Sequence, residues 1–490
     1  MKYYSTRNTA VSIESAEAIK MGLSRDGGLL TPQEIPQIDE AFLTSLVNAR
    51  YQERAAKVMG LYLTDYSEEE LMTFAENGYG PEKFDCEAVV PLRKVDDNTH
   101  CMELWHGPTS AFKDVALQML PQLLSSALRK TGEDKTACIL VATSGDTGKA
   151  ALAGFANVPG VKICVFYPEG GVSKVQRAQM VTQEGNNVAV CAVVGNFDDA
   201  QTGVKNIFAT VKDDLTPGNA RLSTANSINI GRLAPQITYY FKAYADLLRR
   251  GVITMGQKVN FSVPTGNFGD ILAGYLAKLL GLPVGMLICA SNANNVLTDF
   301  INTGLYDRRR PLHKTISPSM DILVSSNLER LLYLMTEDTD LVAGLMKQLN
   351  TEGFYQVPES LRTAIGAEFW GGYCDDKAAT QVIGKVFENT GYLCDTHTAT
   401  GWAVAEDYQV QTGDKTPMVV LSTASPYKFP AAVLAALEDN DDPDEFARMD
   451  RLCQLTGVKI PENLVSVRYK KELHTDIIAK EDMLSRVLYL

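Results

Sequence analysis

Histidine and tryptophan are scarce in this sequence, and closely paired cysteines are missing. The 490 residues include five histidines and three tryptophans, and the nine cysteines form no CxxC pair. Because no histidines and cysteines have the spacing of metal ligands, we expect no metal centre. An odd number of scattered cysteines, with no apolar secretory signal at the start, predicts reduced thiols in a cytosolic protein.

Long apolar runs and an excess of positive charge are also absent. No run of about 18 apolar residues occurs, so we expect no membrane span. The 46 lysines and arginines face 59 aspartates and glutamates, which gives a formal charge of −13. This balance argues against nucleic acid or an anionic membrane as the main partner. An anionic small molecule would have to be bound by local basic groups and backbone amides.

The length and the sequence pattern predict three parts. A chain of 490 residues is too long for one hydrophobic core. We expect an N-terminal α+β domain in residues 1–95, a catalytic region in residues 96–440 and a helical extension in residues 441–490. The N-terminal domain should contain helices at residues 15–21, 39–59 and 67–77, the last opened by a capping box of Ser67 and Glu70.

Residues 96–290 repeat one pattern, in which an apolar strand is followed by a polar turn and a helix. We expect strands at residues 137–142, 162–166, 187–194 and 259–263. Strands that alternate with helices predict α/β lobes built on parallel sheets. Ligands of such sheets bind at the carboxyl ends of the strands, where the turns TSGDTG and PTGNFGD lie.

Lys113 lies in the segment HGPTSAFKDVAL, between an expected strand at residues 101–105 and an expected helix at residues 115–128. Pro121 should break that helix near residues 118–121. The positive end of the helix dipole and burial beside Phe112 both disfavour an ammonium ion, so the pKa of Lys113 should be lowered. A lysine of this kind forms Schiff bases with carbonyl compounds. The alternative is an ordinary solvated lysine at the start of a helix.

Four further segments have both a structural and a chemical interpretation. PTGNFGD (residues 264–270) can bind an anion with the amides at a helix N-terminus, and ATSGDTG (residues 142–148) offers hydroxyls and amides suited to a carboxylate. TANSINIGR (residues 224–232) offers an arginine and two side-chain amides, and VVLSTASPYKF (residues 419–429) is a strand that runs into a hydroxyl-rich turn. By pattern alone, residues 264–270 and 224–232 are more commonly ordinary helix caps, and residues 419–429 are an ordinary strand end.

Together these segments resemble those of threonine synthases, and GLSRDGGLLTP near the start resembles the N-terminal signature of that family. The resemblance implies an α/β fold of type II among pyridoxal-phosphate enzymes, like tryptophan synthase β, with the cofactor between two lobes. It also implies that the enzyme is a monomeric, cytoplasmic lyase. The implied reaction converts O-phospho-L-homoserine and water to L-threonine and phosphate.

The resemblance also assigns a role to individual residues. Lys113 would hold pyridoxal phosphate covalently and move protons during the reaction. The implied cofactor-binding residues are Lys113, Asp146, Gly266, Asn267, Phe268, Gly269, Asp270 and Thr423. The implied substrate-binding residues are Thr143, Ser144, Thr147, Asn226, Ser227 and Arg232.

Two residues leave questions open at this point. Related enzymes carry asparagine at the position of Asp146, and an aspartate facing the 3′-oxygen of the cofactor would repel it unless the two share a proton. His397, in DTHTATGWA, is either a general base or a structural histidine. Two other functions also remain: another lyase of the same fold, such as a serine/threonine dehydratase or cysteine synthase, or a non-catalytic relative that binds pyridoxal phosphate.

Overall fold

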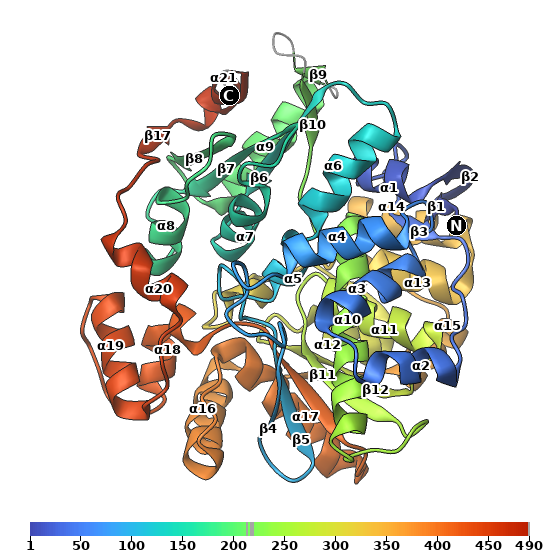
Figure 1. Cartoon of the computed structure of the whole chain (residues 1–490), viewed down its shortest axis with the longest axis vertical. Coiled ribbons are helices and arrows are strands. Elements are labelled where there is room, and N and C mark those ends of the chain that lie inside the picture. The colour runs from blue at the N-terminus through green and yellow to red at the C-terminus, as the bar shows by residue number, and fades with distance from the viewer. Residues whose placement is uncertain (212–213, 216–219, 489–490) are drawn as a thin grey trace.

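The computed structural model describes residues 1–211, 214–215 and 220–488. Two six-stranded sheets form the centres of two lobes, and the N-terminal residues lie beside them (Figure 1). Within these described residues, no helix is both long enough and apolar enough to cross a membrane.

The sheet of the first lobe is parallel except at one edge. Only β9 runs antiparallel to its neighbour. In spatial order its strands are β17 (Asp476–Ile478), β8 (Val188–Val193), β7 (Val161–Pro168), β6 (Thr136–Ala142), β10 (Ala220–Ser223) and β9 (Asp214–Leu215). Its helices are α7 (Asp146–Phe155), α8 (Lys174–Val181), α9 (Phe197–Val211) and α21 (Met483–Leu488).

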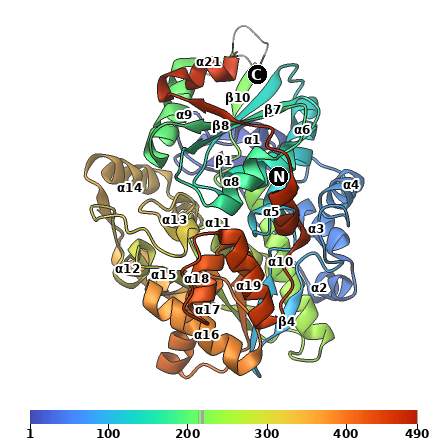
Figure 2. The same ribbon diagram turned by 90° about the vertical axis from the view of Figure 1, so that its left-hand side faces the viewer.

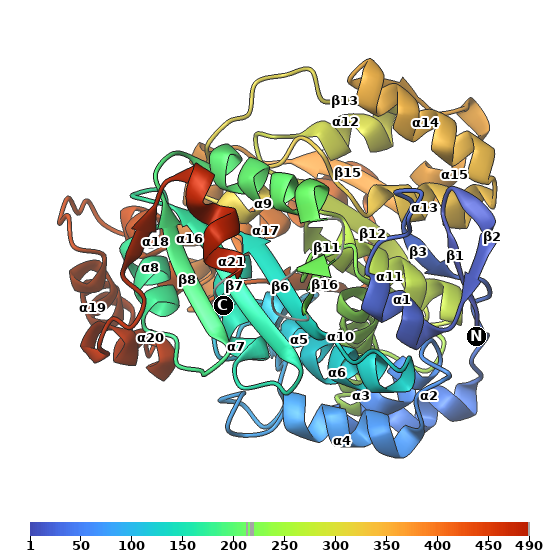
Figure 3. The same cartoon turned by 90° about the horizontal axis from the view of Figure 1, so that it is seen from above.

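Alternation along β6 explains why helices cover both faces of this sheet. Cys138 and Leu140 pack in one apolar cluster with residues of α9 and α21. Ile139 and Val141 point to the other face, into the main core that includes residues of α7 and α8. Figure 3 shows α9 and α21 on one side of the strands and α7 and α8 on the other. Strands buried on both faces in this way are typical of parallel α/β sheets.

The sheet of the second lobe is also parallel except at one edge, where β4 is antiparallel to β5. In spatial order its strands are β15 (Phe369–Tyr373), β12 (Val284–Ser291), β11 (Val259–Pro264), β16 (Met418–Ser422), β5 (Thr99–Glu103) and β4 (Leu92–Lys94). Its helices include α10 (Ile230–Arg249), α11 (Gly269–Leu280), α12 (Val296–Thr303), α16 (Asp376–Thr390) and α17 (Thr396–Thr412). The strand β4 belongs to the sheet of the second lobe, although it precedes residue 95, where we expected the N-terminal domain to end.

The N-terminal residues form a small antiparallel sheet, β2–β1–β3, with helices packed beside it. Its elements are β1 (Tyr3–Ser5), β2 (Asn8–Ile13), α1 (Ser15–Met21), β3 (Leu30–Pro32), α2 (Glu40–Val47), α3 (Tyr51–Gly60) and α4 (Glu68–Gly78). The expected helix at residues 39–59 is two helices, because the chain turns at residues 48–50. The capping box of Ser67 and Glu70 is confirmed at the start of α4.

The remaining elements cover the second lobe and the side of the molecule. Two strands that are distant in the chain, β13 (Leu305–Asp307) and β14 (Phe354–Gln356), pair as a two-stranded antiparallel sheet. The elements around them are η1 (Pro318–Met320), α13 (Leu328–Thr336), α14 (Thr339–Thr351) and α15 (Glu359–Glu368). The C-terminal elements are η2 (Pro426–Lys428), α18 (Pro430–Ala435), α19 (Glu445–Thr456), α20 (Glu462–Ser466), η3 (Val467–Tyr469) and η4 (Lys480–Asp482). Figure 2 shows the chain passing from α19 up to α21 beside the first sheet.

The C-terminal extension is not entirely helical, contrary to the sequence-based expectation. Residues 476–478 form β17, which pairs in parallel with β8 at the edge of the first sheet. A segment of three residues is too short to show the alternating pattern of a strand. We attribute its strand conformation to backbone pairing with the edge strand β8.

The helix after Lys113 is broken where Pro121 predicts. The helix α5 (Lys113–Leu117) ends before Gln118, and α6 (Leu120–Lys130) begins with Pro121 in its first turn. A proline costs nothing there, because its missing N–H would have no partner within the helix. Lys113 therefore begins a short helix of its own.

The helix α5 is held against α7 by a close backbone approach at Gly154. A Cβ atom at this position would lie 1.9 Å from the carbonyl oxygen of Leu117, the last residue of α5. Because α5 begins at Lys113 and α7 begins at Asp146, this contact sets the relative position of these two residues.

We therefore predict that Gly154→Ala separates α5 from α7. The change should lower the free energy of unfolding by about 1–3 kcal/mol, the usual cost of overpacking a core. Gly366→Ala in the exposed part of α15 is the control, because its Cβ would meet no atom within 4 Å. That variant should be neutral or slightly stabilising. Urea unfolding measures both, and equal stability of the two variants would contradict the prediction.

Candidate active site between the two lobes

Segments that follow strands of both sheets contact one another between the lobes. The segments are those after β5, β6, β10, β11 and β16, and η1 joins them from the second lobe. The carboxyl ends of parallel strands are where α/β proteins bind their ligands. The contacts described below bring together all four segments that the sequence singles out, and the loop of Lys113.

The loop that carries Lys113 is fixed to the end of β16 by backbone hydrogen bonds. The Phe112 N–H donates to Thr423 O (2.8 Å), and the Ser425 N–H donates to Ser110 O (3.0 Å). Lys113 then begins α5, which confirms its expected place at a strand-to-helix junction. Lys113 and Thr423, which are 310 positions apart, are thereby neighbours.

Asp114 shapes the same loop, although the sequence gave no reason to select it. Its carboxylate accepts from the Thr109 N–H (2.8 Å) and from Thr109 Oγ1 (2.7 Å). A Cβ atom on Gly107 would lie 2.5 Å from Asp114 Cβ, so this close approach requires glycine. Burial raises the pKa of Asp114 to about 6.

The surroundings of Lys113 lower its pKa, as the sequence predicts. Its Nζ lies 4.6 Å from the centre of the Phe112 ring and donates to Ser319 Oγ (3.3 Å). Burial is the main cause of the lowered pKa, and Lys428 and Arg232 add to it, while Asp146 opposes them. A larger fraction of neutral amine makes Lys113 a better nucleophile and base.

Asp146 forms a buried ion pair that joins the two lobes. Its Oδ1 lies 2.7 Å from Lys428 Nζ and accepts from Gln176 Nε2 (3.0 Å). Asp146 follows β6 of the first lobe, and Lys428 follows β16 of the second. Burial opposes ionisation of Asp146, but Lys428 and Lys113 hold its pKa well below the usual value.

Lys428 is the main residue that sequence reasoning missed. Its side chain is fully buried, and its Nζ also donates to Thr109 O (3.0 Å) and Gln179 Oε1 (3.3 Å). The one sequence feature that could have pointed to Lys428 is its place in SPYKF, in the turn that follows the apolar strand β16. A lysine in that position is usually solvated, so the sequence alone could not identify its partner.

The turn at residues 264–270 leaves little room for side chains. Phe268 has a left-handed backbone (φ 65°), and a Cβ on Gly266 would lie 2.8 Å from Ser319 O. The helix α11 begins at Gly269, so its free N–H groups lie at this turn. Burial raises the pKa of Asp270, in the first turn of α11, to about 6. Gly266 and Asn267 are held through their carbonyl oxygens, which accept from Ser325 Oγ (2.7 Å) and the Asn327 N–H (3.1 Å).

Arg232 is a buried guanidinium with no carboxylate bound to it in the described residues. Its Nη1 donates to Ala225 O (2.9 Å), while its buried Nε has no hydrogen-bond partner within the described part of the chain. Burial lowers its pKa to about 10. Leaving a buried charged donor unsatisfied is costly, and a bound anion would remove that cost.

Asn226 and Ser227 lie in the turn before α10, the helix that contains Arg232. Asn226 is exposed, and Ser227 Oγ donates to its Oδ1 (3.3 Å). Asn327 Nδ2 donates to Ser227 O (3.4 Å) and to Asn267 O (3.0 Å). One side chain therefore connects this turn with the turn at residues 264–270.

The three hydroxyls of the ATSGDTG turn differ in their surroundings. Thr143 is buried, and its Oγ1 accepts from the Gly145 N–H (3.0 Å) and the Gly148 N–H (2.9 Å). Ser144 is exposed and Thr147 is partly exposed. The Thr143 hydroxyl therefore shapes the turn first, and it keeps one proton to donate.

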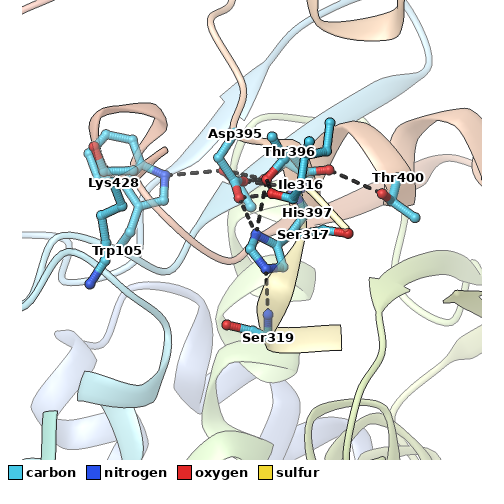
Figure 4. Close-up of polar contacts among 12 residues, drawn as sticks. Trp105, Ile316, Ser317, Ser319, Asp395, Thr396, His397, Thr400 and Lys428 are labelled. Atoms are coloured by element: carbon cyan, nitrogen blue, oxygen red, sulfur yellow. Dashed lines mark hydrogen bonds and ion pairs between the residues drawn. The ribbon is translucent and has the colours of Figure 1, made fainter. Parts of the chain in front are cut away.

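His397 has both ring nitrogens bonded, and this favours a structural histidine over a general base. Its Nδ1 lies 2.7 Å from Asp395 Oδ2, and its Nε2 accepts from the Ser319 N–H (3.2 Å), as Figure 4 shows. Because Nε2 is an acceptor, the ring is neutral, with its proton on Nδ1 toward Asp395. His397 thus holds η1, whose Ser319 is the hydrogen-bond partner of Lys113.

Three family models match consecutive parts of the chain. The model described as pyridoxal-phosphate dependent enzyme matches residues 89–424. The model of the threonine synthase N terminus matches residues 2–79, and that of the threonine synthase C-terminal region matches residues 398–476. The fold is therefore that of a fold type II pyridoxal-phosphate enzyme.

Individual relatives define the family more closely. The chain is 41% identical to a Pseudomonas aeruginosa threonine synthase over 435 residues, 88% of this chain and 90% of that one. A crystal structure of PLP-bound threonine synthase from Brucella melitensis aligns with a TM-score of 0.89 and 37% identity, covering 100% of this chain and 99% of the other. The chain belongs to the threonine synthase family. It is also 40% identical to human threonine synthase-like 1, covering 86% of this chain but only 58% of that longer protein.

The site fits the cofactor of this enzyme class. Pyridoxal phosphate needs a lysine of lowered pKa and an anion site for its phosphate. Lys113 meets the first need. The turn at residues 264–270, with close backbone packing at Gly266 and the start of α11 at Gly269, meets the second.

We predict that Lys428→Met destabilises the protein, because it leaves the buried Asp146 carboxylate unpaired. The expected loss is about 3–5 kcal/mol in the free energy of unfolding of the cofactor-free protein. Asp146→Asn in the same chain should recover part of it. The matched control is Lys174→Met, which removes an exposed pair with Asp444 (3.3 Å) and should cost at most about 1 kcal/mol. Equal losses for Lys428→Met and Lys174→Met in urea unfolding would disprove a stabilising pair.

Proposed function

We propose that the protein converts O-phospho-L-homoserine and water to L-threonine and phosphate. The observation that carries this proposal is the buried Arg232 guanidinium, which has no carboxylate partner among the residues that the structure describes and contributes to the lowered pKa of Lys113. A second anion site near the reactive lysine suits a substrate that carries a phosphate of its own. The family relationship supports the same reaction.

Each part of the cofactor has a candidate partner in the site. Lys113 would hold it covalently, and the turn with Gly266, Asn267, Phe268, Gly269 and Asp270 would bind its phosphate through backbone amides. Thr423 would present a neutral hydroxyl to the ring nitrogen. When bound, pyridoxal phosphate supplies the electron sink that stabilises a carbanion next to the substrate nitrogen.

Asp146 and Lys428 would together face the 3′-oxygen of the cofactor. An isolated aspartate would repel that oxygen, which made Asp146 the least expected of the site residues. The ammonium of Lys428, 2.7 Å from the Asp146 carboxylate, offsets this repulsion. The pair then presents a hydrogen-bond donor and nearly zero net charge.

Proton transfer would be the task of Lys113. As a neutral amine, its Nζ would remove the proton from Cα of the substrate and pass that proton on. Neutral again, it would take one proton from Cβ as the Cγ–O bond breaks and phosphate leaves. Protons would then return to Cγ, which becomes the methyl group, and to Cα, while water adds at Cβ. Ser319 Oγ lies between this amine and the Asp146 carboxylate, at 3.3 Å and 3.5 Å. It is placed to keep Nζ directed into the site.

The substrate would be bound at two ends. Arg232, with Asn226 and Ser227, would bind its phosphate, since a guanidinium can donate two parallel hydrogen bonds to phosphate oxygens. Thr143, Ser144 and Thr147 with the amides at the start of α7 would bind its carboxylate. A lyase of the same fold whose substrate lacks phosphate would not need the first of these sites.

The test of the function is stoichiometric turnover by the purified protein reconstituted with pyridoxal phosphate. We expect a yellow protein that forms phosphate and threonine in equal amounts from O-phospho-L-homoserine, and Lys113→Ala should abolish both turnover and the bound visible absorbance. A yellow protein that is inert with this substrate but acts on serine, threonine or acetylserine would favour another lyase. A protein that cannot bind the cofactor would contradict the role of Lys113.

Arg232→Ala should raise KM for O-phospho-L-homoserine by roughly 10²-fold, because about 3 kcal/mol of charged hydrogen bonding is lost. Arg232→Lys should recover little, since an ammonium cannot reproduce the paired donors. Arg249→Ala, at the exposed end of the same helix, is the control and should leave KM unchanged. Steady-state kinetics measure KM for each variant. An unchanged KM for Arg232→Ala would show that Arg232 does not bind the substrate phosphate.

A further inference from the structure

A second polar cavity lies behind the loop of Lys113 and has no part in the proposed reaction. Its volume is about 170 Å³, several times the roughly 30 Å³ that one water occupies in the liquid. Its lining comes from the loop before α5, from α7, from the end of α8 and from the C-terminal extension. The lining residues used below are Lys149, Gln179, Thr182, Asn463, Ser466 and Lys470. We call this space the Lys149 cavity.

The cavity contains a buried ammonium without an ion-pair partner. The side chain of Lys149 is 8% exposed, and its Nζ donates to the neutral Gln183 Oε1 (2.6 Å). Within the described part of the chain, no carboxylate forms a salt bridge with it. Burial and the neighbouring Lys470 lower the pKa of Lys149 to about 7. A buried charge that is not paired is costly, and a bound anion would remove that cost.

Lys470 provides a second cation at the open side of the cavity. It is exposed, lines the same space and makes no salt bridge among the described residues. Thr182, Asn463 and Ser466 add neutral polar groups. Glu184 also lines this space, with an exposed carboxylate. The two ammonium groups outnumber this one carboxylate, so the cavity favours a small oxyanion over an apolar ligand.

We propose that the Lys149 cavity binds a phosphate dianion, held between the ammonium groups of Lys149 and Lys470. The site is separate from the anion site at Arg232, because its lysines lie on α7 and after η3, and Arg232 does not line the cavity. The cavity has room for a tetrahedral oxyanion and a few waters. Its ligand is a free phosphate ion or the phosphate group of a small ester.

An anion bound here would contact residues that hold the active site. Asn463 Nδ2 donates to Gly107 O (2.9 Å), and Ser110 Oγ donates to Asn463 Oδ1 (2.9 Å), so Asn463 clamps the loop of Lys113. Gln179 accepts from Lys428 Nζ (3.3 Å), the partner of Asp146. Lys149 lies one helical turn after Asp146 on α7. Occupancy of the cavity therefore acts on the same groups that surround the cofactor.

The experiment is calorimetric titration of the pyridoxal-phosphate-loaded protein with inorganic phosphate, in the Arg232→Ala background so that only the cavity site remains. That protein should bind one phosphate. Lys149→Met and Lys470→Gln, each added to this background, should weaken binding about 10-fold or more, because each removes one charge-assisted contact. Lys471→Gln, an exposed neighbour outside the lining, is the matched control and should change nothing.

Two further measurements keep the proposal open to refutation. If Arg232→Ala fails to fold, Lys470→Gln in the wild-type background should weaken one phosphate-binding event about 10-fold and leave any binding at Arg232 unchanged. Competition by glycerol 3-phosphate identifies an ester as an accepted ligand, and its failure identifies the free ion. Unchanged phosphate affinity in both Lys149→Met and Lys470→Gln would overturn the proposal. The titration in the Arg232→Ala background depends neither on turnover nor on a phosphate site at Arg232, so its outcome is independent of the proposed reaction.

Discussion

The buried ion pair of Asp146 and Lys428 is the contact on which the arrangement of the active site depends. Each residue follows a strand of a different sheet, so the pair fixes the two lobes at the point where their strand ends meet. Lys428 also bonds to Thr109 O in the loop of Lys113, and Asp146 bonds to Gln176 and Ser319. A buried ion pair of this kind need not stabilise the protein relative to a pair of apolar residues. Removing one partner alone, however, leaves an unpaired charge in the core. Both residues are therefore required together.

The same pair determines the charge that the cofactor and substrate meet. Lys428 and Arg232 are two cationic groups in one site, Asp146 is an ionised carboxylate near them, and the lowered pKa of Lys113 favours its neutral amine. Asp270, whose pKa is raised to about 6, adds only part of a negative charge near that pH. A protein with a formal charge of −13 thus encloses a locally positive site. That local excess explains how it can bind an anionic substrate, and why the amine of Lys113 loses its proton more easily.

Much of the fold and the lysine-centred site could be predicted from the sequence, because both depend on local pattern. Apolar strands followed by polar turns predicted the α/β lobes, and Pro121 predicted the break after α5. The lysine junction and the turn at residues 264–270 also have local signatures. Lys428, Asp114 and Ser319 could not be identified in this way. Their roles come from contacts with residues far along the chain, and as single polar residues they have no pattern that distinguishes them from solvated ones. The strand β17 was missed for a related reason, since its conformation is set by the edge of β8.

The ionisation state of Asp146 is the most direct test of this account. Carbon-13 NMR of protein labelled at the aspartate carboxyl groups, with Asp146→Asn to assign the resonance, would follow this carboxylate as the pH is lowered. The account predicts that Asp146 stays ionised below the ordinary aspartate pKa of about 3.9, for as long as the protein remains folded. It also predicts that Lys428→Met raises the pKa of Asp146 by several units. A carboxylate that takes up its proton near neutral pH in the wild-type protein would contradict the account, because Lys428 would then not be its ion-pair partner.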